Sequence, residues 1–158
     1  QFALPGSPLL YDGSEVGLTG RDDPEMRGPM RWDRVEQGHP QLAWTRQLIA
    51  LRRQRALKVG DYRAVTTRKL FAFERHTDRA LETVVVVANP TPHDVKELLL
   101  IANSALMDGT LLIDLLCQVP PVVVQSALVT LTVPAHTVLV LKPQPQRDDG
   151  YSPYKRVR

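Results

Sequence analysis

The pattern of apolar and polar positions changes at about residue 60. Before it come an apolar start, a polar stretch at residues 11–33 without a helical or strand period, and a basic stretch with helical spacing. After it, apolar and polar residues alternate with a period of two, which is typical of strands with one buried face. We therefore expect two parts with different architectures.

The basic stretch predicts one helix over residues 40–58, with Pro40 in its first turn. A helix that is apolar on two sides is usually held between two layers. Its two apolar faces carry Trp44, Leu48 and Leu51 on one side and Leu42 and Ile49 on the other.

Short apolar runs separated by turn residues predict strands in the second part. The runs lie at residues 69–75, 81–89, 93–101, 109–116, 127–133 and 136–142. Because no helix intervenes, we expect a mainly β fold, an antiparallel sandwich of the Greek-key kind. We expect this sandwich to cover residues 59–143, with an extended tail at residues 144–158.

Composition narrows the function classes. Hydrophobic residues make up 43% and charged residues 23%, as in ordinary globular proteins. The net charge is +3, but basic and aromatic residues do not interleave, so we expect no nucleic-acid partner. The apolar runs are too short to span a bilayer, so we expect no membrane partner. The single cysteine, Cys117, excludes an intrachain disulfide.

Motifs for nucleophilic catalysis, phosphate binding or metal binding are missing, so we expect neither a metal nor a cofactor. Acidic residues do gather in the polar stretch, where such residues are commonly turn formers. Asp23 and Arg27 are four positions apart, and a tight turn could direct both side chains to one ligand.

Two motifs carry a family resemblance. Residues 4–17, LPGSPLLYDGSEVG, resemble the stretch L-P-G-x-P-x-x-Y-Y-G-D/S-E-x-G at the end of the catalytic barrel in the α-amylase family of glycoside hydrolases, with a departure at Asp12. Residues 23–33, DPEMRGPMRWD, resemble the family's D-P-x-x-R-x-P-M-x-W-D loop. The helix and strands that follow resemble the last barrel helix and the C-terminal sandwich.

The resemblance implies that residues 1–58 are the eighth strand, substrate loop and eighth helix of a TIM (β/α) barrel, with residues 8–11 as the strand. It implies that Asp23 and Arg27 hold a glucose unit on the non-reducing side of the cleaved bond. The alternative is an ion pair that only shapes the loop, and both could hold.

Three more residues are secondary candidates for the site. Tyr11 could contact sugar, and Trp32 could stack on it, although packing at the base of the loop is favoured. The resemblance suggests that Glu15 supports the structure and is not the catalytic acid.

The resemblance further implies an enzyme that hydrolyses or transfers α-glucosidic linkages in starch-like glucans or maltooligosaccharides with retention. Such enzymes need two carboxylates about 5 Å apart, and in this family these come from earlier barrel strands. We therefore expect no catalytic residue in this chain, which begins inside an apolar segment without Met and resembles a piece of a longer protein. On its own it should be inactive.

The expected partners are the glucan, the missing N-terminal catalytic domain and, through exposed apolar barrel surface, a second copy. We expect a soluble protein of the bacterial cytoplasm or periplasm. The alternative is a free-standing carbohydrate-binding or structural sandwich without catalysis. Binding modules usually present several exposed aromatic side chains, whereas this sandwich offers Tyr62, Phe71 and Phe73.

Overall fold

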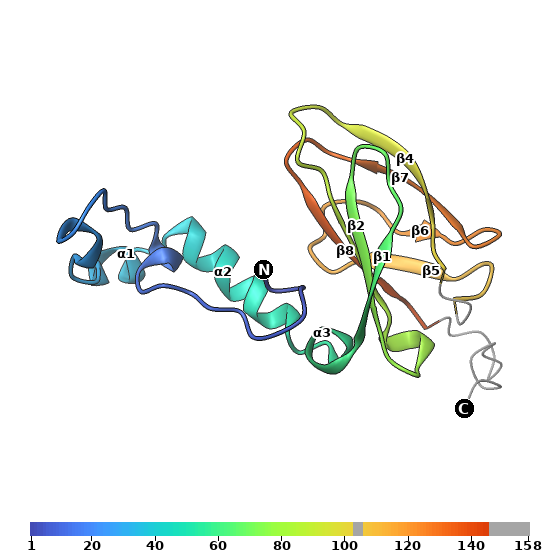
Figure 1. Ribbon diagram of the computed structural model, residues 1–158, viewed down its shortest axis with the longest axis horizontal. Coiled ribbons are helices and arrows are strands. Elements are labelled where there is room, and N and C mark those ends of the chain that lie inside the picture. Colours follow the sequence, from blue (N-terminus) through green and yellow to red (C-terminus); the bar gives the residue numbers. More distant parts are fainter. Residues whose placement is uncertain (103–105, 146–158) are drawn as a thin grey trace. The chain divides into compact units, whose positions relative to one another are not determined.

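The computed structural model of the chain describes residues 1–102 and 106–145. They form two compact units, Gln1–Arg53 and a second unit that begins at Gln54 (Figure 1). The first unit contains only helices and loops, and the second contains every described strand. The change of pattern near residue 60 therefore corresponds to a change of architecture.

The first unit is built around helix α2 (Pro40–Leu51). The His39 ring caps this helix, since its Nδ1 accepts the backbone N–H of Gln41 at 3.3 Å. Three shorter elements precede it: the 3₁₀ helices η1 (Ser14–Val16) and η2 (Glu25–Arg27), and α1 (Trp32–Glu36). The stretch predicted as irregular thus contains short helical turns.

The prediction of one helix over residues 40–58 is wrong, because α2 ends at Leu51 and a separate helix, α3 (Arg55–Val59), follows. Gln54 between them is extended, with φ −63° and ψ 124°. Its Oε1 accepts a hydrogen bond from the ammonium group of Lys142 at 2.6 Å, a contact within the second unit. A partner 88 positions away in the sequence thus favours the break, which no Gly or Pro signals.

The predicted barrel strand at residues 8–11 does not form. Within the described part of the chain, no residue before Asp61 is paired in a sheet. A barrel strand needs neighbouring strands on both sides to satisfy its backbone groups, and the first unit supplies none. Leu9 is accordingly 78% exposed.

The second unit is an antiparallel sandwich, as predicted. One sheet has the strand order β1-β2-β3-β8-β5-β6, and the other pairs β4 with β7. The strands are β1 (Asp61–Val65), β2 (Phe71–His76), β3 (Val84–Ala88), β4 (Val95–Leu100), β5 (Leu111–Asp114), β6 (Val122–Val123), β7 (Leu128–Val133) and β8 (Val138–Pro143). The extended tail was predicted for residues 144–158, and its part beyond residue 145 lies outside the described residues.

Six of these strands were predicted, with longer bounds, and β1 and β6 were not. The predicted run at residues 81–89 begins instead with a 3₁₀ helix, η3 (Ala80–Glu82). The pairings of β3 with β8 and of β4 with β7 are nested in the sequence, as in Greek-key folds.

The main core lies between the two sheets. On β7, Val129, Leu131 and Val133 are buried while the threonines between them are exposed, as the alternation predicted. They share one apolar cluster with residues of β3 such as Val85 and Val87.

Strand β3 is also buried on its opposite face. Val84 and Val86, which alternate with the core residues, are at most 4% exposed. Helix α3 packs against the neighbouring strand β2, and its Leu57 is fully buried. Strand β3 is therefore apolar on both faces, which is typical of strands in sheets that are covered on both sides.

Asn89 joins two turns of the sandwich. Its amide nitrogen donates to the carbonyls of His93 at 2.8 Å and of Val133 and Pro134 at 3.0 Å. Its Oδ1 accepts the backbone N–H and the hydroxyl of Thr91. The side chain is 2% exposed, so these bonds replace its contacts with water.

Candidate functional site

A hollow of about 440 Å³ lies within the first unit. Two walls enclose it: a first wall, residues 11–18, around η1, and a second wall, residues 25–28, around η2. Its lining residues are Tyr11, Asp12, Ser14, Leu18, Thr19, Gly20, Glu25, Met26, Arg27 and Gly28. The lining mixes a ring, hydroxyl groups, two carboxylates and a guanidinium, which suits a polar ligand with an apolar face.

The first wall is a tight turn whose shape depends on glycine. Gly13 and Gly17 flank η1 and both have positive φ, 79° and 67°, which glycine adopts without the clash of a Cβ. Between them the Val16 side chain is fully buried. From α2, the Gln41 amide donates to the Ser14 carbonyl at 2.6 Å and so holds the turn against the helix.

The second wall packs closely on Gly20. A Cβ at Gly20 would lie 2.5 Å from the Cα of Met26, so only glycine allows this approach. Met26 donates its backbone N–H to the Asp22 carbonyl at 3.1 Å. At its end, Arg27 Nη2 donates to Asp23 Oδ2 at 2.6 Å, and both side chains are more than half exposed.

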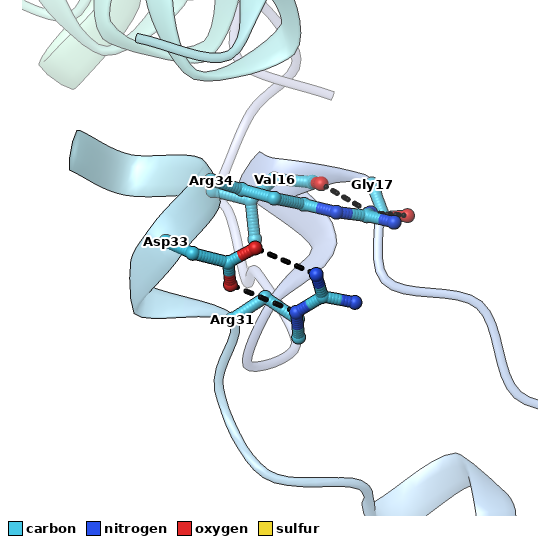
Figure 2. Close-up of polar contacts among 5 residues, drawn as sticks. All are labelled: Val16, Gly17, Arg31, Asp33 and Arg34. Carbon is cyan, nitrogen blue, oxygen red and sulfur yellow. Dashed lines mark hydrogen bonds and ion pairs between the residues drawn. The ribbon is translucent and has the colours of Figure 1, made fainter. Parts of the chain in front are cut away.

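A second pair of charges lies at the start of α1 (Figure 2). The Arg31 guanidinium donates two parallel hydrogen bonds to the Asp33 carboxylate, from Nε to Oδ1 at 2.8 Å and from Nη2 to Oδ2 at 2.6 Å. The hydrogen bond from Arg31 is the main cause that lowers the pKa of Asp33 below its ordinary 3.8. The same bond, followed by the attraction of the carboxylate charge, raises the pKa of Arg31.

Arg34, one position further along α1, turns towards the first wall (Figure 2). Its Nη1 donates to the carbonyls of Val16 at 3.0 Å and of Gly17 at 2.9 Å. The short helix α1 therefore connects to both walls, by hydrogen bonds to the first and by the chain of residues 28–31 to the second.

The structure brings two of the predicted site residues, Tyr11 and Arg27, into the lining of the hollow. Asp23 forms the ion pair with Arg27 that we had named as the alternative, while its contact with substrate stays a prediction. Glu15 is partly buried and Trp32 is 67% exposed, and neither lines the hollow. In this chain the predicted packing of Trp32 at the base of the loop is therefore wrong.

Sequence reasoning missed two carboxylates of the lining, Asp12 and Glu25. Asp12 was noted only as a departure from the motif, and Glu25 only as a turn former. The available signal was their position beside Gly13 and Pro24: Asp12 precedes Gly13, the N-cap of η1, and Glu25 follows Pro24 as the first residue of η2.

Residues 1–102 and 106–145 contain no group of three or more His, Cys, Asp or Glu side chains placed to hold a metal ion. No helix within these residues has both the length and the apolarity needed to cross a membrane.

No protein-family model matches the chain. It is 48% identical over 62 residues to a cyclomaltodextrinase of Geobacillus thermopakistaniensis, a match that covers 39% of this chain and 10% of that protein. It is 45% identical over 53 residues to the intracellular maltogenic amylase of Bacillus subtilis, covering 34% of this chain and 9% of that one. The matches thus span about a tenth of these curated relatives.

Solved structures match over nearly the whole chain. A cyclomaltodextrinase structure aligns with a TM-score of 0.75 and 28% identity over 91% of this chain and 24% of that chain. An α-amylase from Anoxybacillus, at 24% identity, shares the fold with a TM-score of 0.74 over 92% of this chain and 31% of that chain. By sequence and by fold, the chain is therefore similar to a part of glycoside hydrolases of the α-amylase family.

Proposed function

We propose that the chain is the C-terminal part of an enzyme that hydrolyses or transfers α-glucosidic linkages in starch-like glucans or maltooligosaccharides with retention. In this proposal the chain supplies part of a sugar subsite and a stabilising sandwich. The two catalytic carboxylates belong to the missing N-terminal domain. The coverage of a quarter to a third of the solved relatives supports the assignment to a part of a larger enzyme.

The observation that carries the sugar subsite is the pairing of Arg27 with Asp23 beside Tyr11. The ion pair uses Nη2 of Arg27 and Oδ2 of Asp23 and does not involve the other guanidinium N–H groups or the second carboxylate oxygen, and both side chains are more than half exposed. A glucose unit presents neighbouring hydroxyls that both donate and accept, which matches such a pair. The Tyr11 ring, 59% exposed, lies at the same hollow and offers an apolar face to the sugar ring.

Binding of maltoheptaose to the full chain tests this function. We expect backbone amide signals of residues 11–28 to shift on titration. Arg27→Ala and Asp23→Ala should each weaken the binding about tenfold or more, because a hydrogen bond to a charged group contributes about 1.5–3 kcal/mol.

Arg79→Ala is the matched control, since Arg79 is also an exposed arginine in an ion pair, with Glu82 in the sandwich. If the three variants and the unsubstituted chain bind maltoheptaose with equal affinity, the Asp23–Arg27 pair is purely structural. If the unsubstituted chain does not bind maltoheptaose, the sugar subsite is rejected.

A binding role for the sandwich itself is the second candidate. Tyr62 and Phe71 are 43% and 50% exposed, and each ring contacts Phe73, with centroids 5.2 and 5.6 Å apart. If sugar instead shifts the signals of these strands, and Tyr62→Ala abolishes binding while Arg27→Ala does not, the chain is a carbohydrate-binding sandwich.

A further inference from the structure

We propose that Arg34 is a positioning residue of the sugar subsite: it fixes the first wall of the hollow and thereby sets the affinity for glucan. The inference rests on the proposed function, because it assigns a role in the same subsite. Neither motif that carries the family resemblance contains this residue, since the second motif ends at Asp33.

The contact itself is specific. A single nitrogen, Nη1, donates to two consecutive carbonyls, those of Val16 at 3.0 Å and Gly17 at 2.9 Å (Figure 2). The side chain is partly buried, and within residues 1–102 and 106–145 it takes part in no ion pair. The charge of Arg34 is therefore directed at the backbone of the first wall.

The first wall needs such a partner. Val16 and Gly17 lie at the carboxyl end of η1, where no following helical turn provides N–H donors for the carbonyl groups. A cation at this end also meets the partial negative charge of the carbonyls. Without the Arg34 side chain, water would be the hydrogen-bond partner of both carbonyls, and the turn between Gly13 and Leu18 would be less firmly held.

The position of this turn matters because Arg34 also belongs to the element that follows the second wall. Only residues 29–31 separate Gly28 from α1, so a group fixed to α1 is fixed closely to Arg27. The contacts of Arg34 with the first wall therefore hold Tyr11 and Arg27 at a set separation across the hollow. Gln41 supports the same wall from α2 through the Ser14 carbonyl.

The test compares Arg34→Gln, Arg34→Lys and the control Arg46→Gln in the full chain. Arg46 is an exposed arginine of α2 and does not line the hollow. Two quantities are measured: hydrogen exchange of the amides of residues 13–18, and the dissociation constant of maltoheptaose. For Arg34→Gln we expect faster exchange in this segment and a dissociation constant raised about tenfold.

Arg34→Lys should recover most of both losses, because an ammonium can also donate to two carbonyls. Gln41→Met, which removes the other support of the first wall, should change both quantities in the same direction, and it replaces Arg34→Gln if that variant does not fold. Amide exchange within the sandwich should be unchanged throughout.

Unchanged exchange in Arg34→Gln, or faster exchange without loss of affinity, overturns the positioning role. So does a loss of affinity that lysine does not recover at all. If the parent chain itself fails to bind maltoheptaose, the proposed function fails and the positioning role falls with it. The supporting result, in a chain that binds maltoheptaose, is a loss of affinity in Arg34→Gln and Gln41→Met that is largely recovered in Arg34→Lys and absent in Arg46→Gln.

Discussion

The side chain of Asn89 uses both polar atoms of its amide, accepting at Oδ1 and donating to three carbonyls. We expect Asn89→Ala to lower the free energy of unfolding by about 2–4 kcal/mol, because it leaves buried backbone groups without their partner. Asn89→Asp should destabilise further, since it places a carboxylate against those carbonyls. Urea unfolding measures both, with Thr132→Ala on an exposed position as the control.

Asp33 provides a second test at this scale. Its pKa is lowered in the folded chain, so the pair with Arg31 stabilises the fold above the ordinary pKa of 3.8. That contribution is lost as the pH falls through the lower, folded pKa. An NMR titration of the Asp33 carboxyl carbon should show the pKa rise towards its ordinary value in Arg31→Gln and stay unchanged in Arg21→Gln. No rise in Arg31→Gln would mean that the pair is absent in solution.

Single residues also show how far sequence reasoning reaches. The spacing of Asp23 and Arg27 was sufficient to suggest their ion pair as the alternative to sugar contact, because neighbours four positions apart in a turn depend mainly on local geometry. The exposure of Trp32 was missed, because burial depends on which distant segments pack against a side chain. The contacts of Arg34 with Val16 and Gly17 span 18 and 17 positions and had no local signal either.

Among the elements, those with a strong repeating pattern were predicted and those fixed by partners were not. The alternation of residues 127–133 was sufficient for β7. Strand β1 was missed because Asp61 and Arg63 interrupt its apolar run, and it is recognisable only through its pairing with β2. The break between α2 and α3 has the same origin, since Gln54 is held by Lys142.

The second wall of the hollow offers a test at the scale of an element. A Cβ added at Gly20 would lie 2.5 Å from Met26 Cα and 2.8 Å from the Glu25 carbonyl, so Gly20→Ala should displace η2. We expect weaker binding of maltoheptaose and shifted amide signals for residues 22–28. Gly28→Ala is the control for displacement, since its Cβ would meet the Glu25 carbonyl at 3.4 Å, an ordinary contact. Equal shifts in both variants would contradict this explanation.

At the scale of the whole molecule, the proposed division of labour predicts that the purified chain has no glycosidase activity. The reason is that the retaining mechanism needs two carboxylates about 5 Å apart, which the proposal places in the missing domain. Starch, maltoheptaose and a chromogenic maltoside are the substrates to assay. Turnover that persists at constant specific activity through successive purification steps would contradict the assignment of the catalytic carboxylates to another domain.

The exposed apolar surface of the first unit predicts self-association of the isolated chain. Leu9, Trp32 and Tyr11 are 78%, 67% and 59% exposed, and exposed apolar surface of sufficient extent often marks a protein–protein contact. Replacing Leu9 and Leu10 by serine should shift sedimentation towards the monomer. Leu98→Ser, at a 54% exposed position of the sandwich, should not. The reverse result would assign the contact to the small sheet.

The place of β8 in the larger sheet has a consequence for biosynthesis. This strand lies between β3 and β5, although it is the last strand of the described chain. Its partners Val85–Ala88 are synthesised about fifty residues earlier, so during translation the backbone groups on this edge of β3 stay unpaired until β8 emerges. The sandwich should therefore close only after Pro143 has left the exit tunnel, and the long sequence separation should make closure slow. A ribosome stalled before Val138 would hold an open, aggregation-prone sheet and not a smaller folded domain.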